Sequence, residues 1–305
     1  MAFHEFYKKE VLWLKAKGAN IYCIVYIPKK NPSAEVMVVH HGFSEHSGRY
    51  ANLIEALEEL RYTIYLFDMR GHGRTDGKRG HANYQDLLDD LDLVINIALE
   101  REPAEKVILF GHSLGAVVSA LYAENPEKQK KIKALVLSSL ATEHKLNFIN
   151  KLKKFIAPLF AKIVPETTVT TNVDPTVISH DPAVVQQYAK DKFNHGEISF
   201  ALGNFFMNSE KRILADSKKL KIPLYMFHGK ADPLIDYHGS QLFFENAGSK
   251  IKELKLYEGL YHETLNEYPL NRQMVENDLI AWLSSHIRKK IKKEKTNGTI
   301  KRNRR

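Results

Sequence analysis

The residues best suited to chemistry stand in the stretch Gly111-His112-Ser113-Leu114-Gly115, which follows the apolar run 107–110 and opens an alanine-rich segment. A serine on a sharp turn from a buried strand into a helix is exposed above the sheet, and the crowded turn leaves no room for side chains two residues away on either side. Glycine at 111 and at 115 meets that steric need. The turn also directs the Leu114 amide and the dipole of the following helix at a developing negative charge. We therefore predict that Ser113 is a nucleophile.

A serine hydroxyl needs a base, and an acid that orients the base; on such a turn they follow in the chain order serine, acid, histidine. Asp232 and Asp236 both follow the strand expected at 224–227. Asp232 lies nearer the strand end and precedes a proline that fixes the turn, whereas Asp236 suits the cap of the next helix. His262 is the histidine of the last loop before the final helix. We therefore predict a triad of Ser113, Asp232 and His262.

The chemistry also needs amides that bind the oxyanion of a tetrahedral intermediate. Gly42, in the loop after the strand expected at 36–40, lets the backbone approach a substrate closely. We predict the amides of Phe43 and Leu114 as the two donors. The nearby His40, His41 and His46 have no cysteine or carboxylate ligand pattern around them, so we expect no metal site, and the reaction needs no cofactor.

Short β-branched apolar runs alternate with segments of helical periodicity, which is typical of a mostly parallel sheet with helices on both faces. The segment 13–28, with Gly18 at a turn, predicts an antiparallel hairpin beside the parallel strands. Strands are expected at 21–27, 36–40, 63–67, 107–110, 134–137, 224–227 and 253–257. Helices are expected at 49–60, 85–99, 113–122, 238–245 and 274–291.

This alternation stops at 141–217, which has helical periodicity and no convincing strand. We interpret it as a helical cap inserted into a core made of residues 1–140 and 218–290. Its first part, 147–165, gathers apolar side chains on one face and lysines elsewhere. Two readings stay open, a cap helix packed over the core and a lid whose apolar face meets lipid. The cap residues that are candidates to line a substrate tunnel, with ordinary cap packing as the alternative, are Phe155, Phe160, Phe205, Phe206 and Met207.

The net charge of +9 is concentrated at the C-terminus. Residues 286–305 hold ten of the 45 Lys and Arg and one of the 36 Asp and Glu, which leaves 35 of each sign in residues 1–285. The last part, 291–305, has the composition of a disordered basic tail. It is interpreted as a passive solvated segment, with tethering to anionic lipid as the alternative; nucleic acid is not an expected partner.

A single cysteine, Cys23, rules out an internal disulfide. No apolar stretch approaches the roughly 18 residues that span a bilayer, and the first residues lack the apolar core of a secretory signal. We therefore expect a cytoplasmic protein, with peripheral membrane contact through the cap and the tail as an open alternative. The sequence does not indicate an oligomeric state.

Five motifs together resemble the monoacylglycerol lipase and lysophospholipase branch of the α/β-hydrolases. They are HGFSEHSGRY (41–50), FDMRGHGRTDG (67–77), GHSLGA (111–116), HGKADPLID (228–236) and YEGLYHE (257–263), and the cap segment SHDPAVVQQYAKD (179–191) is similar as well. The resemblance implies an α/β-hydrolase fold with an eight-stranded core, a helical cap over an apolar tunnel, and the same triad and oxyanion donors. The family often has a small residue after the oxyanion glycine, so the bulky Phe43 is expected to narrow or reshape the acyl pocket.

Together these observations predict a serine hydrolase that cleaves carboxylic esters of lipid-like substrates, monoacylglycerols first, through an acyl-enzyme. Lysophospholipids and short- or medium-chain esters remain alternative substrates, because the fold does not fix the substrate. A ligand-binding α/β-hydrolase without catalysis is the alternative from another class, and the filled triad positions argue against it.

Overall fold

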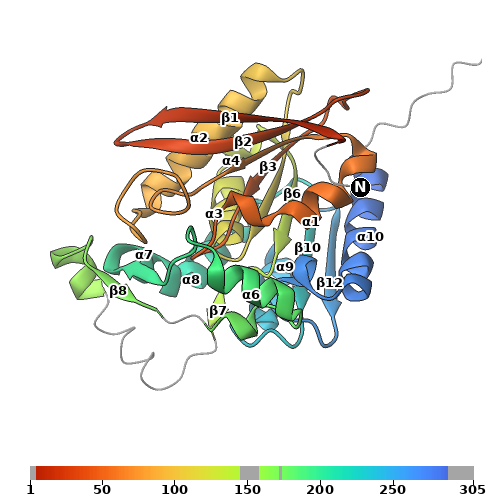
Figure 1. The fold of residues 1–305 in the computed structure, drawn as a ribbon. Helices are drawn as coiled ribbons and strands as arrows, with labels where there is room; N and C mark the ends of the chain where they lie inside the picture. The colour runs from red at the N-terminus through yellow and green to blue at the C-terminus, as the bar shows by residue number, and fades with distance from the viewer. Residues whose placement is uncertain (1–4, 145–157, 172–173, 288–305) are drawn as a thin grey trace, which may run out of the picture.

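The computed structural model describes residues 5–144, 158–171 and 174–287, and an eight-stranded sheet forms its centre (Figure 1). The strand order is β1-β2-β4-β3-β5-β6-β10-β12. β1 and β2 form an antiparallel hairpin, with Gly18 at positive φ in its turn, and β2 pairs antiparallel with β4. The other neighbouring pairs are parallel. The prediction of a mostly parallel eight-stranded sheet is therefore confirmed.

The strands of this sheet are β1 (Tyr7–Ala16), β2 (Ala19–Pro28), β3 (Val36–His40), β4 (Thr63–Phe67), β5 (Val107–His112), β6 (Ile132–Ser138), β10 (Leu224–Gly229) and β12 (Lys252–Tyr257). Side chains along the inner strands of the sheet alternate between two separate apolar cores, as the two-residue period of a strand requires. In β3, for example, Val38 belongs to one core and Met37 to the other. Both faces of the sheet are therefore covered by other elements.

One face is covered by α2 (Tyr84–Arg101), α3 (Leu114–Glu124) and α9 (Tyr237–Asn246), and the other by α1 (Ala51–Ala56) and α10 (Pro269–His286). The short α4 (Pro126–Gln129) follows α3. α10 begins at Pro269, earlier than the predicted 274, because a proline fits the first turn of a helix, where its missing N–H is not needed. Helices on both faces agree with the prediction from the alternating pattern.

The predicted continuous helix over 49–60 is wrong. The structure has a 3₁₀ turn η1 (Ser47–Arg49), then α1, then a second 3₁₀ turn η2 (Glu58–Leu60). Tyr50 leaves helical geometry at φ −100° and ψ 24°, and its hydroxyl donates to Glu45. Buried polar contacts of this segment, which periodicity does not reveal, therefore interrupt the helix.

The expectation that the cap holds no strand is also wrong, because two short strands, β8 (Thr168–Thr170) and β9 (Glu197–Ser199), pair antiparallel within it. A third, β7 (Glu143–His144), pairs with β11 (Ile235–Asp236) of the core. The described helices of the cap are η3 (Pro175–Val177), α6 (Pro182–Lys190), α7 (Phe200–Met207) and α8 (Ser209–Asp216), with residues 158–163 also helical and η4 (Ser217–Lys219) at its end. Figure 1 shows α6, α7 and β8 gathered along one edge of the sheet.

Candidate active site

Ser113 occupies the turn between β5 and α3 with a strained backbone, φ 53° and ψ −118°. A Cβ on Gly115 would lie 2.2 Å from the carbonyl oxygen of His41, and one on Gly111 would lie 2.6 Å from Cα of Ala116. Either contact is impossible without displacing backbone. The predicted steric need for both glycines is confirmed. For Gly115 it arises because the start of α3 packs against the end of β3, and for Gly111 because α3 packs back against the end of β5.

The three side chains predicted as a triad lie in one chain of hydrogen bonds. His262 Nε2 is 3.0 Å from Ser113 Oγ, and His262 Nδ1 is 2.6 Å from Asp232 Oδ2. Ser113 follows β5, Asp232 follows β10 and His262 follows β12, so parallel strands deliver all three to one edge of the sheet. Their exposed fractions are 8%, 1% and 6% respectively, so the contacts are nearly free of solvent.

The charges of the site stabilise the protonated form of His262 and keep Asp232 ionised. Burial alone lowers the pKa of His262, but the charge and hydrogen bond of Asp232, with Glu263 and Glu45 beyond it, raise that pKa above its ordinary value of 6.5. Burial alone raises the pKa of Asp232, but His262 and His228 lower it well below its ordinary value. An imidazole held in this way can accept the proton of Ser113.

Asp236, the alternative acid, has a different role in the structure. Its carboxylate accepts a hydrogen bond from the His238 amide at the start of α9, 3.0 Å away. This is the helix cap predicted for it. Its side chain is therefore engaged away from His262.

The backbone at the predicted oxyanion donors is held in place from several sides. His41 Nε2 accepts the Met69 amide at 2.8 Å, so His41 Nδ1 carries the proton and donates to the Gly42 carbonyl at 2.7 Å. The Gly42 amide donates to Glu45 at 2.7 Å. Because carbonyl and N–H point to opposite sides of a trans peptide, holding the Gly42 carbonyl directs the Phe43 amide the other way. Within the part of the chain that the structure describes, that amide has no hydrogen-bond partner.

Gly42 itself lies against the nucleophile, because a Cβ built on it would be 3.1 Å from Ser113 Cβ. Leu114 is the first residue of α3, where backbone N–H groups have no partner within the helix. The two amides are thus available as donors beside Ser113, as an oxyanion site requires.

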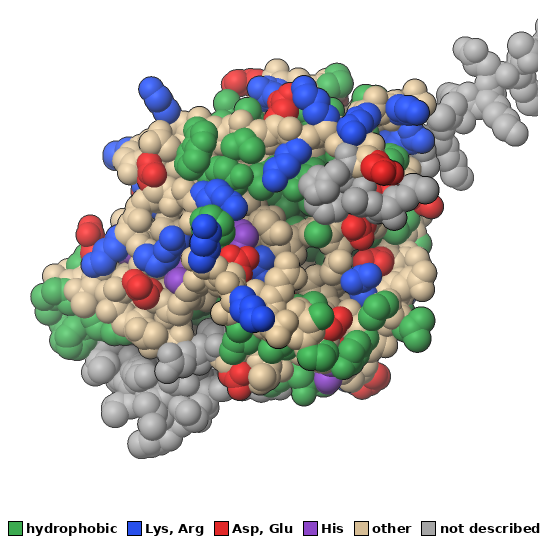
Figure 2. Space-filling model, viewed as in Figure 1, with side chains coloured by type: hydrophobic (Ala, Val, Ile, Leu, Met, Phe, Trp, Pro, Cys, Tyr) green, Lys and Arg blue, Asp and Glu red, His purple; other side chains and the backbone are tan. Residues whose placement is uncertain are grey.

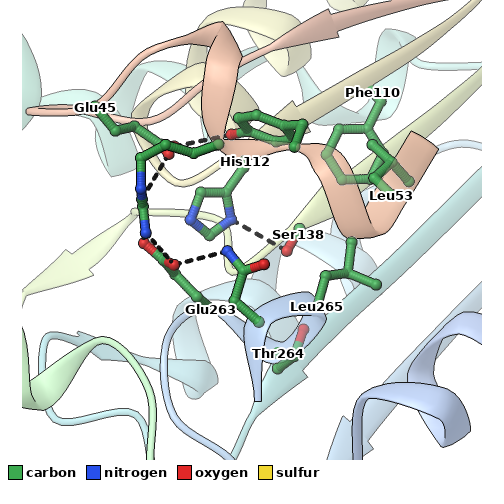
Figure 3. Close-up of a pocket in the computed structure, with 11 residues that line it drawn as sticks. Glu45, Leu53, Phe110, His112, Ser138, Glu263, Thr264 and Leu265 are labelled. Atoms are coloured by element: carbon green, nitrogen blue, oxygen red, sulfur yellow. Dashed lines mark hydrogen bonds and ion pairs between the residues drawn. The ribbon is translucent and has the colours of Figure 1, made fainter. Parts of the chain in front are cut away.

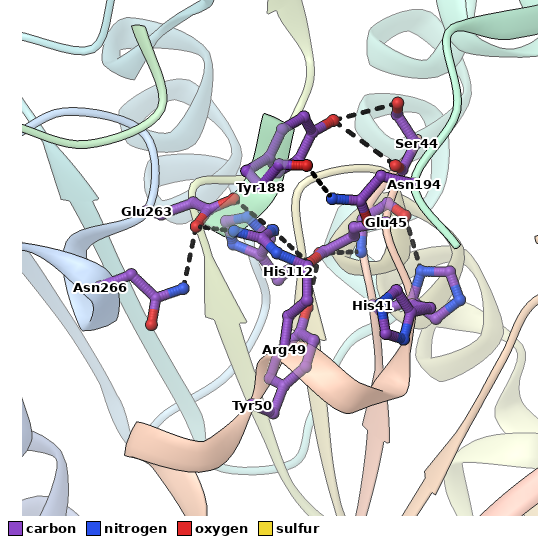
Figure 4. A network of polar contacts seen from close by, with 12 residues as sticks. His41, Ser44, Glu45, Arg49, Tyr50, His112, Tyr188, Asn194, Glu263 and Asn266 are labelled. Atoms are coloured by element: carbon purple, nitrogen blue, oxygen red, sulfur yellow. Dashed lines mark hydrogen bonds and ion pairs between the residues drawn. The ribbon is translucent and has the colours of Figure 1, made fainter. Parts of the chain in front are cut away.

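A buried ionic network lies next to this loop (Figure 4). Arg49 donates to both carboxylate oxygens of Glu263 at 2.6 and 2.8 Å, and to Glu45 at 2.8 Å. Glu45 also accepts from the Tyr50 hydroxyl. Burial raises the pKa of Glu263, but Arg49 outweighs it and holds that pKa below its ordinary value. The network therefore holds an ionised carboxylate directly beside His262.

The same loop contacts the cap segment 188–195. The Tyr188 hydroxyl is 3.0 Å from Ser44 Oγ, and the Tyr188 ring stacks on the Arg49 guanidinium, 4.6 Å away. His46 Nδ1 accepts the Gly48 amide, so its Nε2 donates to Asp191 at 2.9 Å. The loop that carries the predicted oxyanion amide is thus fixed to the cap by several polar contacts (Figure 4).

A cavity of about 170 Å³ opens over Ser113 and is mainly apolar. Phe43 lines it, together with the apolar side chains of Ile178, Phe206, Leu234 and Ile235. The polar residues Glu45, His112, Tyr188 and Glu263 also line it. The cavity therefore offers both apolar and polar contacts within reach of the nucleophile.

Among the cap residues predicted to line a tunnel, Phe206 lines this cavity. Phe205 is buried and packs on Tyr84 in the core, and Phe160 packs on Phe200 and is exposed. Met207 is not among the lining residues. Phe155 and the tail 291–305 lie outside the described residues. The sequence analysis missed Ile178, Tyr188, Leu234 and Ile235, although Tyr188 lies in the segment 179–191 that resembled the family.

Figure 3 shows a second, smaller cavity of about 20 Å³. Glu45, His112 and Glu263 line both cavities. This volume suffices for one water molecule. The Thr264 hydroxyl, which lines it, is buried and unpaired within the described residues, so it offers such a water a partner.

Among the described residues, the group with a spacing suited to a metal ion is His228, Asp232 and His262. Their nitrogen and oxygen atoms are already paired with one another at 2.6 and 2.9 Å. Hydrogen bonding accounts for that spacing. In the described part of the chain no helix is both long and apolar enough to cross a membrane.

Comparisons with known proteins agree with this architecture. The family model Hydrolase_4, described as serine aminopeptidase, S33, matches residues 31–269. A monoacylglycerol lipase of Mycolicibacterium smegmatis is 31% identical over 273 residues, which cover 88% of this chain and 95% of that protein. A monoglyceride lipase of Rattus norvegicus is 29% identical, and the match covers 90% of each chain.

Two solved structures are similar over most of the chain. The monoacylglycerol lipase of Paleococcus ferrophilus has a TM-score of 0.79 and 31% identity, covering 87% of this chain and 99% of that one. A soluble variant of the Saccharomyces cerevisiae monoglyceride lipase, in complex with a substrate analog, has a TM-score of 0.83 and 25% identity. The match covers 92% of this chain and 96% of that one.

Proposed function

This chain belongs to the Hydrolase_4 (serine aminopeptidase, S33) family, and from that membership we propose that it hydrolyses monoacylglycerols with Ser113, His262 and Asp232 as its catalytic triad. The resemblance to monoacylglycerol lipases and the α/β-hydrolase fold are confirmed, and the chain is a serine ester hydrolase. The observation that carries the residue assignment is the hydrogen-bonded chain from Ser113 Oγ through His262 to Asp232 beneath the apolar cavity.

His262 takes the proton of Ser113 as Oγ attacks the ester carbonyl, and the oxyanion accepts hydrogen bonds from the Phe43 and Leu114 amides. Collapse of this intermediate breaks the bond to the alcohol oxygen, and His262 returns the proton to the leaving alcohol. Water then attacks the acyl-enzyme, again giving its proton to His262, and the fatty acid leaves as Ser113 is regenerated. Asp232 holds the imidazole in the required tautomer and stabilises its protonated form.

The apolar and polar residues that line the cavity support a substrate with an acyl chain and a polar alcohol. Phe206, Ile178 and Leu234 offer apolar contacts to the chain. Glu45 and Glu263 line the same cavity, and their oxygens, which already accept from Arg49, could accept a further hydrogen bond from a hydroxylated alcohol. The relatives that are monoacylglycerol lipases by name point to the same substrate class.

Substituting Ser113→Ala tests the assignment, because it removes the nucleophile without enlarging a side chain. We expect hydrolysis of monoacylglycerol and of p-nitrophenyl butyrate to fall to the background rate, and labelling by a fluorophosphonate, read by mass at Ser113, to disappear. Ser119→Ala, in α3, is the matched control, and we expect it to retain both hydrolysis and fluorophosphonate labelling. Full activity in Ser113→Ala would overturn the proposal.

A panel of substrates tests the ester class. We expect monoacylglycerol to be cleaved faster than lysophosphatidylcholine and faster than p-nitrophenyl acetate, and aminoacyl p-nitroanilides, suggested by the family description, to be cleaved slowest. Preference for lysophosphatidylcholine would support the lysophospholipase alternative, and preference for acetate would support a short-chain esterase. Binding of an acyl lipid without any turnover would support the ligand-binding alternative.

We further propose that the cap contacts a lipid surface. The side chains of Leu159, Phe160, Ile163 and Val164, next to Val169 of β8, are exposed apolar groups on the cap. Figure 2 shows apolar side chains gathered at the end of the molecule where Figure 1 places β8. Exposed apolar groups of this kind favour an interface with lipid, and the basic residues that follow Ile287 add attraction to anionic headgroups.

Sedimentation with vesicles of phosphatidylcholine and phosphatidylglycerol tests this contact. We expect Leu159→Glu/Ile163→Glu to reduce binding and to slow hydrolysis of vesicle-borne monoacylglycerol, while hydrolysis of soluble p-nitrophenyl butyrate is retained. Leu270→Glu, at an exposed apolar position on α10, is the control. A chain ending at Ile287 tests the tail separately. Unchanged vesicle binding in both variants would contradict the membrane proposal.

A further inference from the structure

We infer that His228 is a positioning residue that holds the Asp232 carboxylate and sets how tightly His262 binds its proton. The inference rests on the proposed triad. His228 is the second-last residue of β10, four residues before Asp232, and is completely buried. Its Nε2 lies 2.9 Å from Asp232 Oδ2, the same oxygen that lies 2.6 Å from His262 Nδ1. One carboxylate oxygen is therefore shared by two imidazoles.

The hydrogen bonds of His228 fix its tautomer. Asp232 is ionised and only accepts, so His228 Nε2 carries the proton and donates. The other nitrogen, Nδ1, is 2.7 Å from Ser240 Oγ on α9 and accepts the hydroxyl proton. Burial lowers the pKa of His228, with Asp232 opposing that effect, so the ring is neutral. A defined chain thus runs from Ser240 through His228 to Asp232.

The other oxygen of the carboxylate is held by the backbone. Asp232 Oδ1 accepts from the Leu234 amide at 2.8 Å and from the Ile235 amide at 3.1 Å. Those two bonds do not depend on the side chain at 228. Removing the His228 donor should therefore leave Asp232 near its present position and change mainly its electronic state.

The direction of that change follows from hydrogen-bond electrostatics. A donor on a carboxylate stabilises the anion and makes it a weaker partner for a neighbouring cation. Without the His228 donor, more of the charge on Oδ2 acts on His262, so the protonated imidazole is stabilised further. His262 then gives up its proton at higher pH, and the neutral base needed for attack is scarcer in mildly acidic solution.

Other charged groups around these rings stay the same in such a variant. Glu263 and Glu45 act on His262, and His112, whose ring is 5.0 Å from that of His262, acts on it from β5. Asp236 at the start of α9 acts on His228, and Arg49 neutralises part of the charge of Glu263. A difference between wild type and variant therefore reports the His228 contact.

The experiment is a pH profile of kcat/KM for soluble p-nitrophenyl butyrate. In His228→Leu we expect the acidic limb to move up by about 0.5–1 pH unit, so that kcat/KM at pH 6 falls about 3–10-fold relative to its value at pH 9, since one pKa unit is a tenfold change in proton affinity. His228→Gln keeps a side-chain N–H donor and should restore most of the wild-type profile. His238→Gln, an exposed histidine on α9, is the matched control.

A readout without substrate separates this inference from the proposed function. In the Ser113→Ala background, the proton NMR titration of His262 should show the same upward shift in His228→Leu, whether or not the protein cleaves the ester. If His228→Leu does not fold, Ser240→Ala, which frees the tautomer of His228, should give a smaller shift of the same sign. An unchanged or lowered midpoint in the folded variant, with only a loss of thermal stability, would overturn the inference.

Discussion

The guanidinium of Arg49 and the carboxylate of Glu263 form two hydrogen bonds of 2.6 and 2.8 Å although 214 positions separate the residues in the chain. Both side chains are more than nine-tenths buried. Arg49 lies after β3 and Glu263 directly after His262, so the pair joins the loop with the predicted oxyanion amide to the loop with the predicted base. The two halves of the site are thus tied by a bidentate ion pair.

Substituting Arg49→Gln should lower the free energy of unfolding by about 3–5 kcal/mol, because it leaves Glu263 buried without a compensating charge. Arg49→Lys keeps the charge but loses the bidentate hydrogen bonding of the guanidinium, so it should lower the free energy of unfolding by less than Arg49→Gln. Urea denaturation at neutral pH measures both. Arg101→Gln, at the exposed pair with Glu10, should cost under about 1 kcal/mol. Equal losses at the two sites would contradict the role assigned to burial.

Substituting Asp232→Asn should lower kcat by roughly 10⁴-fold, because an amide no longer stabilises the protonated imidazole or its working tautomer. Asp236→Asn keeps a side chain that caps helices well, so its kcat and stability should stay close to wild type. Steady-state hydrolysis of p-nitrophenyl butyrate by the two variants measures the contrast. Comparable losses of kcat in both would remove the basis for choosing Asp232.

The activity should depend on pH through His262. Since Asp232 and the neighbouring glutamates outweigh burial and raise the pKa of His262, the acidic limb of kcat/KM should have its midpoint above 6.5. Activity should rise with pH through that midpoint, because attack needs the neutral imidazole. A profile measured from pH 5 to 9 with a neutral substrate tests this. A midpoint below 6 would mean that burial dominates over the carboxylates.

Glu124, in the last turn of α3, should make stability depend on pH. Both of its carboxyl oxygens are buried and unpaired within the described residues, and burial raises its pKa to about 9, with Asp216 adding to the effect and Lys219 opposing it. The unfolded chain releases this proton near the ordinary value of 4.5, so rising pH between about 4.5 and 9 favours unfolding. The neutral Glu124→Gln should therefore gain little stability at pH 5 and about 1–3 kcal/mol at pH 9.

Urea denaturation of wild type and Glu124→Gln at pH 5, 7 and 9 measures that gain. Glu127→Gln, at an exposed position on the neighbouring α4, is the control and should show no trend with pH. A gain that is the same at all three values would show that the carboxyl is ionised in the folded protein.

Much of the sheet was predictable because its strands are buried on both faces. Val36–His40 and Thr63–Phe67 were predicted with the observed bounds, since continuous apolar runs bounded by polar residues leave little choice of register. β8 and β9 were not predicted, because strands of three residues on the cap have neither length nor alternation to distinguish them from loop.

The positions of Ser113, Asp232 and His262 followed from the rule that parallel strands end at one edge. Their surroundings did not follow from any rule of that kind. The sequence analysis assigned no role to His228, and the contact of His228 with Asp232 depends on how β10 and α9 pack. The ion pair of Arg49 with Glu263 could not be predicted either, because residues 214 positions apart leave no local pattern in the sequence.

Ser44, His46 and Arg49 all contact the cap segment 188–195, and Phe43, whose amide is a predicted oxyanion donor, is the residue just before Ser44. A movement of the cap segment 188–195 that admits a bulky ester would also displace the backbone of residues 43–49. Under the proposed mechanism we therefore expect access for the ester and the position of the Phe43 amide to be linked. In the structure His41 and Glu45 already hold the peptide groups of Gly42, so under the proposed mechanism we expect little of the ester's binding energy to be needed to arrange the Phe43 amide.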